Sequence, residues 1–124
     1  HSSAASDVYK RQTLRFVADG VATYLRPGAI LAVSVNGHYL DIRHLTEDRV
    51  ACLTVRKSLA VILTELPGDV FVKIHRSHIV NLHYVQRLKK GKRQYAVKLL
   101  HLDAALPVSR SNLPQVLARL EQTS

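Results

Sequence analysis

Tight-turn signals recur along this chain between apolar segments that have the length of β-strands. Asp19-Gly20 divides TLRFVADGVATYL, Asn36-Gly37 separates ILAVSV from HYLDIRHL, and the segment TED leads into RVACLTV. Asp-Gly and Asn-Gly between β-branched segments favour two-residue hairpin turns, so these signals predict successive antiparallel hairpins. The chain is therefore expected to be mainly β.

Apolar residues recur at i, i+3, i+4 and i+7 in two segments, which predicts two short helices. The first stripe consists of Leu59, Ile62, Leu63 and Leu66. The second consists of Leu113, Val116, Leu117 and Leu120. Ser58 is expected to cap the first helix, Pro67-Gly68 to end it, and Ser111 or Asn112 to cap the second. The expected fold consists of short antiparallel β-sheets with two or more short helices.

A chain of 124 residues fits a single domain. We expect residues 1–11 to be a cloning scar or linker and residues 12–122 to form the domain. Cys52 is the sole cysteine, which excludes an internal disulfide and a cysteine-based zinc cluster and fits a cytoplasmic protein. Because no apolar run approaches about 18 residues, no membrane span is expected.

The formal net charge of +9 is concentrated in the second half of the chain. Between Val70 and Leu120 there are ten Lys or Arg residues and one acidic residue, Asp103. Such a distribution attracts polyanions such as nucleic acid, an anionic membrane or an acidic protein. The alternative at this point is a basic face that is merely solvated.

The strand pattern of FVKIHRSHIVN is interrupted by four polar residues, His75 to His78. Polar interruptions of this kind usually mark a place where the chain leaves the core. Arg76 there would present a planar fork of donors, suited to a phosphate or to guanine, and Ser77 a small hydroxyl. The alternative is a structural loop in which Arg76 pairs with a carboxylate such as that of Asp69.

Other segments offer groups of the same kind. In LPVSRSNL, Arg110 and Ser111 stand directly before a predicted helix, whose free amides attract anions, although Ser111 could simply cap that helix. His38 follows a turn signal and could contact a base edge, or be an ordinary turn histidine. The turn KKGKR, Lys89 to Arg93, would attract phosphates without selecting a sequence, or only blunt a sheet edge.

Enzymatic sites find little support in the sequence. His75, His78 and His83 have a partly metal-like spacing, but His78 would point away from the other two on an extended chain. Ser109 and Ser111 lack a GxSxG context, and no glycine-rich phosphate loop is present. We therefore expect no catalytic residues, no cofactor and no metal.

Taken together, five segments resemble a known family. The similarity is found in FVKIHRSHIVNLHYV, a basic turn and LPVSRSNLPQVL, and upstream in ILAVSVNGHYLDI and VRKSLAVILTELPGD. It is to the LytTR family of bacterial DNA-binding domains. These are the output domains of LytR/AlgR-type response regulators. The resemblance extends over about Thr13 to Leu120.

The resemblance implies a LytTR-like β-rich fold and DNA-binding roles for nine residues. Base contacts fall on His38 in a first loop, Arg76 in a central loop and Arg110 in a last loop. Since some relatives carry Asn at position 76, Arg76 is expected either to clamp a phosphate or to read a base. Contacts to backbone phosphates fall on neighbouring residues, namely Tyr39, Arg56, Ser58, Lys73, Ser77 and Ser111. Asn81 is expected to be structural, with its side chain capping loop backbone.

The function implied is sequence-specific binding of double-stranded promoter DNA in transcriptional regulation. Loops would enter the major groove at direct repeats, with two copies on DNA and a monomer or weak dimer in its absence. An N-terminal sensory or receiver domain of a two-component system is expected outside this chain. The alternatives are a basic protein-interaction module without sequence preference and a histidine metal enzyme, whereas RNA binding would require aromatic platforms that this chain lacks.

Overall fold

The computed structural model describes the backbone of residues 13–123 and the side chains of residues 13–121, so the scar or linker expected over residues 1–11 lies outside it. Over these residues the fold is mainly β with two short α-helices, as expected from the sequence. The strands are β1 (Leu14–Ala18), β2 (Val21–Leu25), β3 (Ile30–Asn36), β4 (Tyr39–Thr46), β5 (Arg49–Val55), β6 (Phe71–His75), β7 (His78–Asn81), β8 (Val85–Lys90), β9 (Tyr95–Leu99) and β10 (Leu106–Val108). The helices are the 3-10 turns η1 (Pro27–Ala29) and η2 (Leu82–Tyr84) and the α-helices α2 (Leu59–Glu65) and α3 (Leu113–Thr123).

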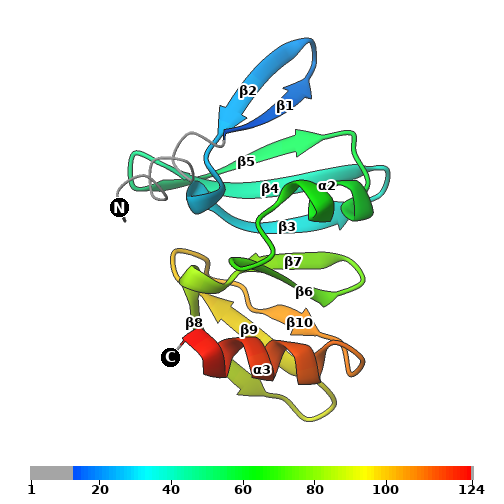
Figure 1. Cartoon of the computed structure of the whole chain (residues 1–124), viewed down its shortest axis with the longest axis vertical. Coiled ribbons are helices and arrows are strands. Elements are labelled where there is room, and N and C mark those ends of the chain that lie inside the picture. The colour runs from blue at the N-terminus through cyan, green and yellow to red at the C-terminus, as the bar shows by residue number, and fades with distance from the viewer. Residues whose placement is uncertain (1–12, 124) are drawn as a thin grey trace, which may run out of the picture.

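The strands form three antiparallel sheets (Figure 1). A two-stranded sheet consists of β1 and β2, a five-stranded sheet has the order β5-β4-β3-β7-β6, and a three-stranded sheet has the order β10-β9-β8. The five-stranded sheet occupies the middle of the molecule, with the β1–β2 hairpin at one end and the three-stranded sheet with α3 at the other (Figure 1). Within residues 13–123, neither α-helix has the length and hydrophobicity needed to cross a bilayer.

Two of the hairpin turns have the backbone geometry of tight two-residue turns. Asp19 and Gly20 both have positive φ, 53° and 77°, as do Glu47 and Asp48, 49° and 66°. Two consecutive positive φ values are the mark of a type I′ turn, which matches the twist of the flanking strands. In the β3–β4 hairpin Asn36 pairs with Tyr39, so the turn consists of Gly37 and His38, one position later than the Asn-Gly signal suggested.

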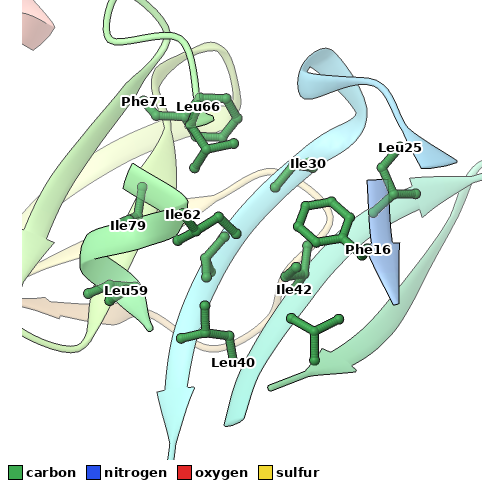
Figure 2. Close-up of a cluster of buried hydrophobic side chains, with 12 residues drawn as sticks. Phe16, Leu25, Ile30, Leu40, Ile42, Leu59, Ile62, Leu66, Phe71 and Ile79 are labelled. Atoms are coloured by element: carbon green, nitrogen blue, oxygen red, sulfur yellow. The ribbon is translucent and has the colours of Figure 1, made fainter. Parts of the chain in front are cut away.

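One face of the five-stranded sheet is covered by α2 and by the β1–β2 hairpin. Between these elements and the sheet lies a cluster of buried apolar side chains. Figure 2 shows Leu59 and Ile62 of α2 on one side of the cluster and Phe16 of β1 near Ile42 on the other. The first core consists of Phe16, Leu25, Ile30, Val33, Leu40, Ile42, Val55, Leu59, Ile62, Leu66, Phe71 and Ile79. Ser58 caps α2 as expected, because its Oγ accepts from the amide of Val61 at 3.2 Å.

The opposite face of the same sheet packs on the three-stranded sheet and α3. This second core consists of Ala32, Val72, Ile74, Val80, Leu82, Val97, Leu99, Leu106, Val108 and Val116. Because β3 lies between both cores, its residues Ile30 to Val33 are all fully buried, which explains the continuous apolar run. On α3, Val116 is buried but Leu117 is 40% exposed, so the predicted stripe was wrong at Leu117.

Asn81 is fully buried at the end of β7 and holds loop backbone, as expected. Its Nδ2 donates to the carbonyl oxygen of Ile30 at 2.9 Å, and its Oδ1 accepts from the amide of His83 at 2.9 Å. The side chain thus joins η2 to the start of β3. A buried amide satisfied in this way fixes the connection between the two cores.

Candidate nucleic-acid interface

Three loops that carry predicted site residues lie at the same end of the molecule, on the right in Figure 1. They are the β3–β4 turn (residues 37–38), the β6–β7 turn (residues 76–77) and the β10–α3 loop (residues 109–112); we call them the loop row. The amide of Val35 donates to the carbonyl oxygen of Ser77 at 2.9 Å, and the amide of Ser109 donates to that of Ile74 at 2.9 Å. Backbone hydrogen bonds therefore link the three loops in series.

The central turn of the loop row is shorter than the polar stretch of the sequence suggested. His75 and His78 pair across β6 and β7, leaving a two-residue turn of Arg76 and Ser77. The two imidazole rings lie 5.4 Å apart, so the expectation that His78 points away from His75 was wrong: a tight hairpin brings them onto neighbouring strands. The amide of Ser77 donates to His75 Nδ1 at 3.2 Å, and Arg76 is exposed at the tip.

Polar side chains beneath this turn connect it to the central strands. Ser34 Oγ lies 2.8 Å from His78 Nδ1 and 3.5 Å from Arg43 Nη1. Burial lowers the pKa of His78, and the nearby charges of His75 and Arg43 lower it further. A neutral His78 is therefore held against Ser34. The sequence reasoning missed Ser34 and Arg43, although Ser34 is the sole polar residue within ILAVSV.

A second polar group fixes the β3–β4 turn from below. The Oδ1 atom of Asp41 accepts from the hydroxyl of Thr54 at 2.9 Å, and its Oδ2 accepts from Asn36 Nδ2 at 3.2 Å. Asp41 faces Ser34 on β3 and Thr54 on β5 in the register of the sheet. The side chains thus tie together three strands at the edge that leads into the loop row.

Four predicted site residues line one groove beside the β3–β4 turn. The groove has a volume of about 420 Å³, and its lining includes His38, Tyr39, Arg56 and Ser58. His38 is exposed at the turn, as expected, and Tyr39 is 47% exposed. Lys57 also lines the groove, but its ammonium lies 2.8 Å from Glu65 and 5.3 Å from the centre of the Phe16 ring. This places Lys57 in the packing of α2.

The β10–α3 loop presents two exposed site residues at the start of a helix. Asn112 directly precedes α3. Its backbone amide donates to the carbonyl oxygen of Ser109 at 3.1 Å, and its Nδ2 donates to the Oγ of Ser109 at 2.6 Å. Its own carbonyl oxygen accepts from the amide of Val116 at 3.0 Å. Asn112, rather than Ser111, therefore occupies the position before the helix. Arg110 and Ser111 are exposed between these anchors, where an anion would be favoured.

Lys73 lies within a strand and outside the loop row. It is half-buried within β6 and pairs with Ile79 in the sheet, two residues before His75. Its position is therefore on the strand that leads into the central turn rather than on an exposed loop.

The opposite end of the molecule carries carboxylates. The β4–β5 turn consists of Glu47 and Asp48, and Asp103 lies in the connection between β9 and β10. In Figure 1 both connections are on the left. That end also carries the exposed Arg26 and Arg49, so its charge is mixed, whereas the loop row presents the cationic side chains of Arg76 and Arg110.

Within residues 13–123, no three His, Cys, Asp or Glu side chains are placed so that they could hold a metal ion. The histidine metal enzyme therefore gains no support from the described residues.

The family model described as the LytTr DNA-binding domain matches residues 22–121 of the chain. The chain belongs to the LytTR family of DNA-binding domains. This confirms the resemblance seen in the sequence motifs, and it makes the protein a member of a non-catalytic family that binds DNA in transcriptional regulation.

A solved structure has the same fold as this LytTR domain. It is the LytTr DNA-binding domain of a Bacillus cereus protein whose description reads methyl-accepting/DNA response regulator. The two chains share 16% sequence identity, the match covers 87% of this chain and 95% of the other, and the TM-score is 0.69. No curated protein matches the chain.

Proposed function

We propose that this LytTR domain binds specific double-stranded promoter sequences by placing the loop row against the major groove. The observation that carries the proposal is the loop row itself: three loops at one end of the fold, joined by the bonds from Val35 to Ser77 and from Ser109 to Ile74, with Arg76 and Arg110 exposed on two of them. A rigid set of loops can hold several side chains in register with a duplex, which sequence readout requires.

Base reading is assigned to the tips of the three loops. Arg110 stands exposed beside the start of α3 and offers a bidentate fork for the O6 and N7 atoms of guanine. His38 can donate or accept at a base edge from the β3–β4 turn. Arg76, at the tip of the central turn, either reads a base or clamps a phosphate, since the guanidinium suits both.

Phosphate contacts are assigned to residues around these tips. Tyr39, Arg56 and Ser58 share the groove with His38, and a groove with a cation and two hydroxyls suits a backbone phosphate. Ser77 and Ser111 flank Arg76 and Arg110 in the same way, and Lys73 would reach from β6. Such contacts fix register and affinity without carrying sequence information.

The biological setting is part of the proposal. The domain would serve as the output domain of a bacterial response regulator in a two-component system, joined to an N-terminal sensory or receiver domain, in the cytoplasm. A monomer or weak dimer would occupy direct repeats as two copies.

Selection from a random pool of duplexes at near-physiological salt tests the proposal. The retained duplexes are sequenced, and enrichment of a motif that recurs as two direct repeats about one helical turn apart is expected. Retention of duplexes without an enriched motif would contradict sequence-specific readout. It would favour the basic protein-interaction module, whose contact with DNA is weak, salt-sensitive and indifferent to sequence.

A further inference from the structure

The densest cationic segment of the chain lies beside the loop row but outside it. We define the basic hairpin as β8, β9 and the turn of residues 91–94 between them. Residues 85–99 contain no Asp or Glu. Their cations are Arg87, Lys89, Lys90, Lys92, Arg93 and Lys98, and all except Lys98 are exposed.

The sheet register places the tip of the basic hairpin at the same end of the molecule as the loop row. Val108, the last residue of β10, pairs with Tyr95, and Tyr95 pairs with Lys90. Ser109 and Arg110 follow Val108 directly, so the β10–α3 loop and the basic turn leave the three-stranded sheet at one edge. Figure 1 shows the β8–β9 turn on the side of the molecule that carries the three loops.

The basic turn has a fixed shape. The amide of Gly91 donates to the carbonyl oxygen of Gln94 at 3.0 Å. A Cβ atom on residue 91 would lie 2.5 Å from that same oxygen, so the turn requires glycine. Lys92 and Arg93 are therefore carried at the tip of a short, closed hairpin, which lowers the entropy cost of holding them against an anion.

The stability of the fold does not explain this charge. Arg87 and Lys98 stand directly opposite each other on β8 and β9, and like charges in such a pair destabilise a sheet. The Nζ of Lys98 donates to the carbonyl oxygen of Leu102, which does not neutralise it. An arrangement that costs stability locally is a common sign of a binding surface.

We propose that the basic hairpin contacts the phosphate backbone of DNA that flanks the recognition site, beyond the β10–α3 loop. The inference rests on the proposed function, because the loop row sets the position of the duplex. The hairpin tip lies one to two strand spacings beyond β10, which is roughly 5 to 10 Å. Phosphates of one DNA strand follow each other about every 3.4 Å along the duplex axis. With the reach of the side chains added, the contact therefore falls about two to five base pairs outside the recognition site.

The test compares two variants that each remove two exposed charges. Lys92→Gln with Arg93→Gln alters the hairpin tip; Arg26→Gln with Arg49→Gln alters the opposite end, where Arg26 precedes η1 and Arg49 begins β5. Binding of the selected duplex is measured between 50 and 400 mM salt, and circular dichroism checks the fold. If the hairpin-tip variant does not fold, Lys89→Gln with Lys90→Gln takes its place.

The hairpin-tip variant is expected to lower the salt slope by about 1 to 2 and to weaken binding about 10- to 60-fold at 0.1 M salt, since each lost phosphate contact removes about 0.9 from the slope. The control variant is expected to keep the wild-type slope. An unchanged slope in the hairpin-tip variant, or an equal loss in both variants, would overturn the contact.

Truncated duplexes locate the contact. Removal of about five base pairs from the flank beside the base read by Arg110 should abolish the difference between wild type and the hairpin-tip variant, and removal from the other flank should leave it. A difference that survives both truncations would overturn the flanking position. If the wild-type domain shows no sequence preference, the proposed function itself is contradicted, and the flanking contact is overturned as well. This outcome is measured on the wild type alone, so it is distinguishable from failure of the hairpin contact.

Discussion

The backbone amide of Ser109 donates to the carbonyl oxygen of Ile74 at 2.9 Å, which ties the loop that carries Arg110 to the strand that carries the central turn. Ser109 directly follows β10 of the three-stranded sheet, and Ile74 lies in β6 of the five-stranded sheet. The position of Arg110 relative to Arg76 is therefore set by main-chain hydrogen bonding rather than by side-chain packing alone. In our proposal this bond keeps two base-contacting loops in a fixed relation.

Arg110→Ala is expected to flatten sequence preference. A bidentate contact from arginine to guanine contributes about 1 to 3 kcal/mol of discrimination, so the ratio of affinities for selected and random duplexes should fall about 5- to 150-fold. Competition binding measures that ratio, with Arg49→Ala at the opposite end as the control. An equal loss of affinity for both duplexes would show that Arg110 contacts only the backbone.

Lys73→Ala is expected to weaken binding of all duplexes to a similar extent and to lower the salt slope by about 1, because the lost contact is to a phosphate. Binding isotherms at several salt concentrations provide the slope, and Arg26→Ala serves as the control for loss of a distant charge. A wild-type slope in the Lys73 variant would remove this half-buried residue from the interface.

Asn81→Ala is expected to destabilise the fold by about 2 to 3 kcal/mol, because it leaves the buried carbonyl oxygen of Ile30 and the amide of His83 without the side chain that satisfies them. Denaturant unfolding measures the change. Asn36→Ala, which removes an exposed side-chain hydrogen bond to Asp41, should cost about 0.5 kcal/mol or less. Equal losses in the two variants would contradict the structural role of Asn81.

The unfolding free energy is expected to fall as pH drops through about 6.5, the ordinary pKa of histidine. The pKa values of His78 and His44 are lowered, mainly by burial, so below this pH the unfolded chain binds protons that the folded protein resists. Stability is thus retained above pH 6.5 and lost on acidification. Urea unfolding between pH 8 and 5 measures it.

His78→Gln should remove part of this pH dependence and leave the part that comes from His44. His38→Gln, at the exposed β3–β4 turn, is the matched control, and the change in the pH profile should be larger in the His78 variant. Stability that rises on acidification, or a wild-type pH profile in the His78 variant, would contradict the attribution of this pH dependence to His78.

The parts of this fold that local chemistry determines could be predicted from sequence. Asp19-Gly20 specifies a tight hairpin by itself, and the Ser58 cap with Leu59, Ile62 and Leu66 specifies α2. The length of the β6–β7 turn could not be predicted, because His75 and His78 are kept in the sheet by cross-strand pairing rather than by their own polarity.

The arrangement of the site residues in space also could not be predicted from local sequence signals. Which strands pair with β3, and the contact between Ser109 and Ile74, depend on residues far apart in the chain. The resemblance of the motifs to the LytTR family indicated His38, Arg76 and Arg110 individually as base-contacting residues. The pairing of β3 with both β4 and β7 places His38 and Arg76 at one end of the molecule, and the hydrogen bond from Ser109 to Ile74 brings Arg110 to the same end.

The claim that the loop row faces DNA is tested most directly by following backbone amide NMR signals while the selected duplex is added. The account predicts the largest shifts at residues 37–38, 76–77 and 109–111, with little change in the β4–β5 turn at Glu47 and Asp48. Shifts centred on the β4–β5 turn and η1, with the loop row unaffected, would place DNA at the opposite end and contradict the account.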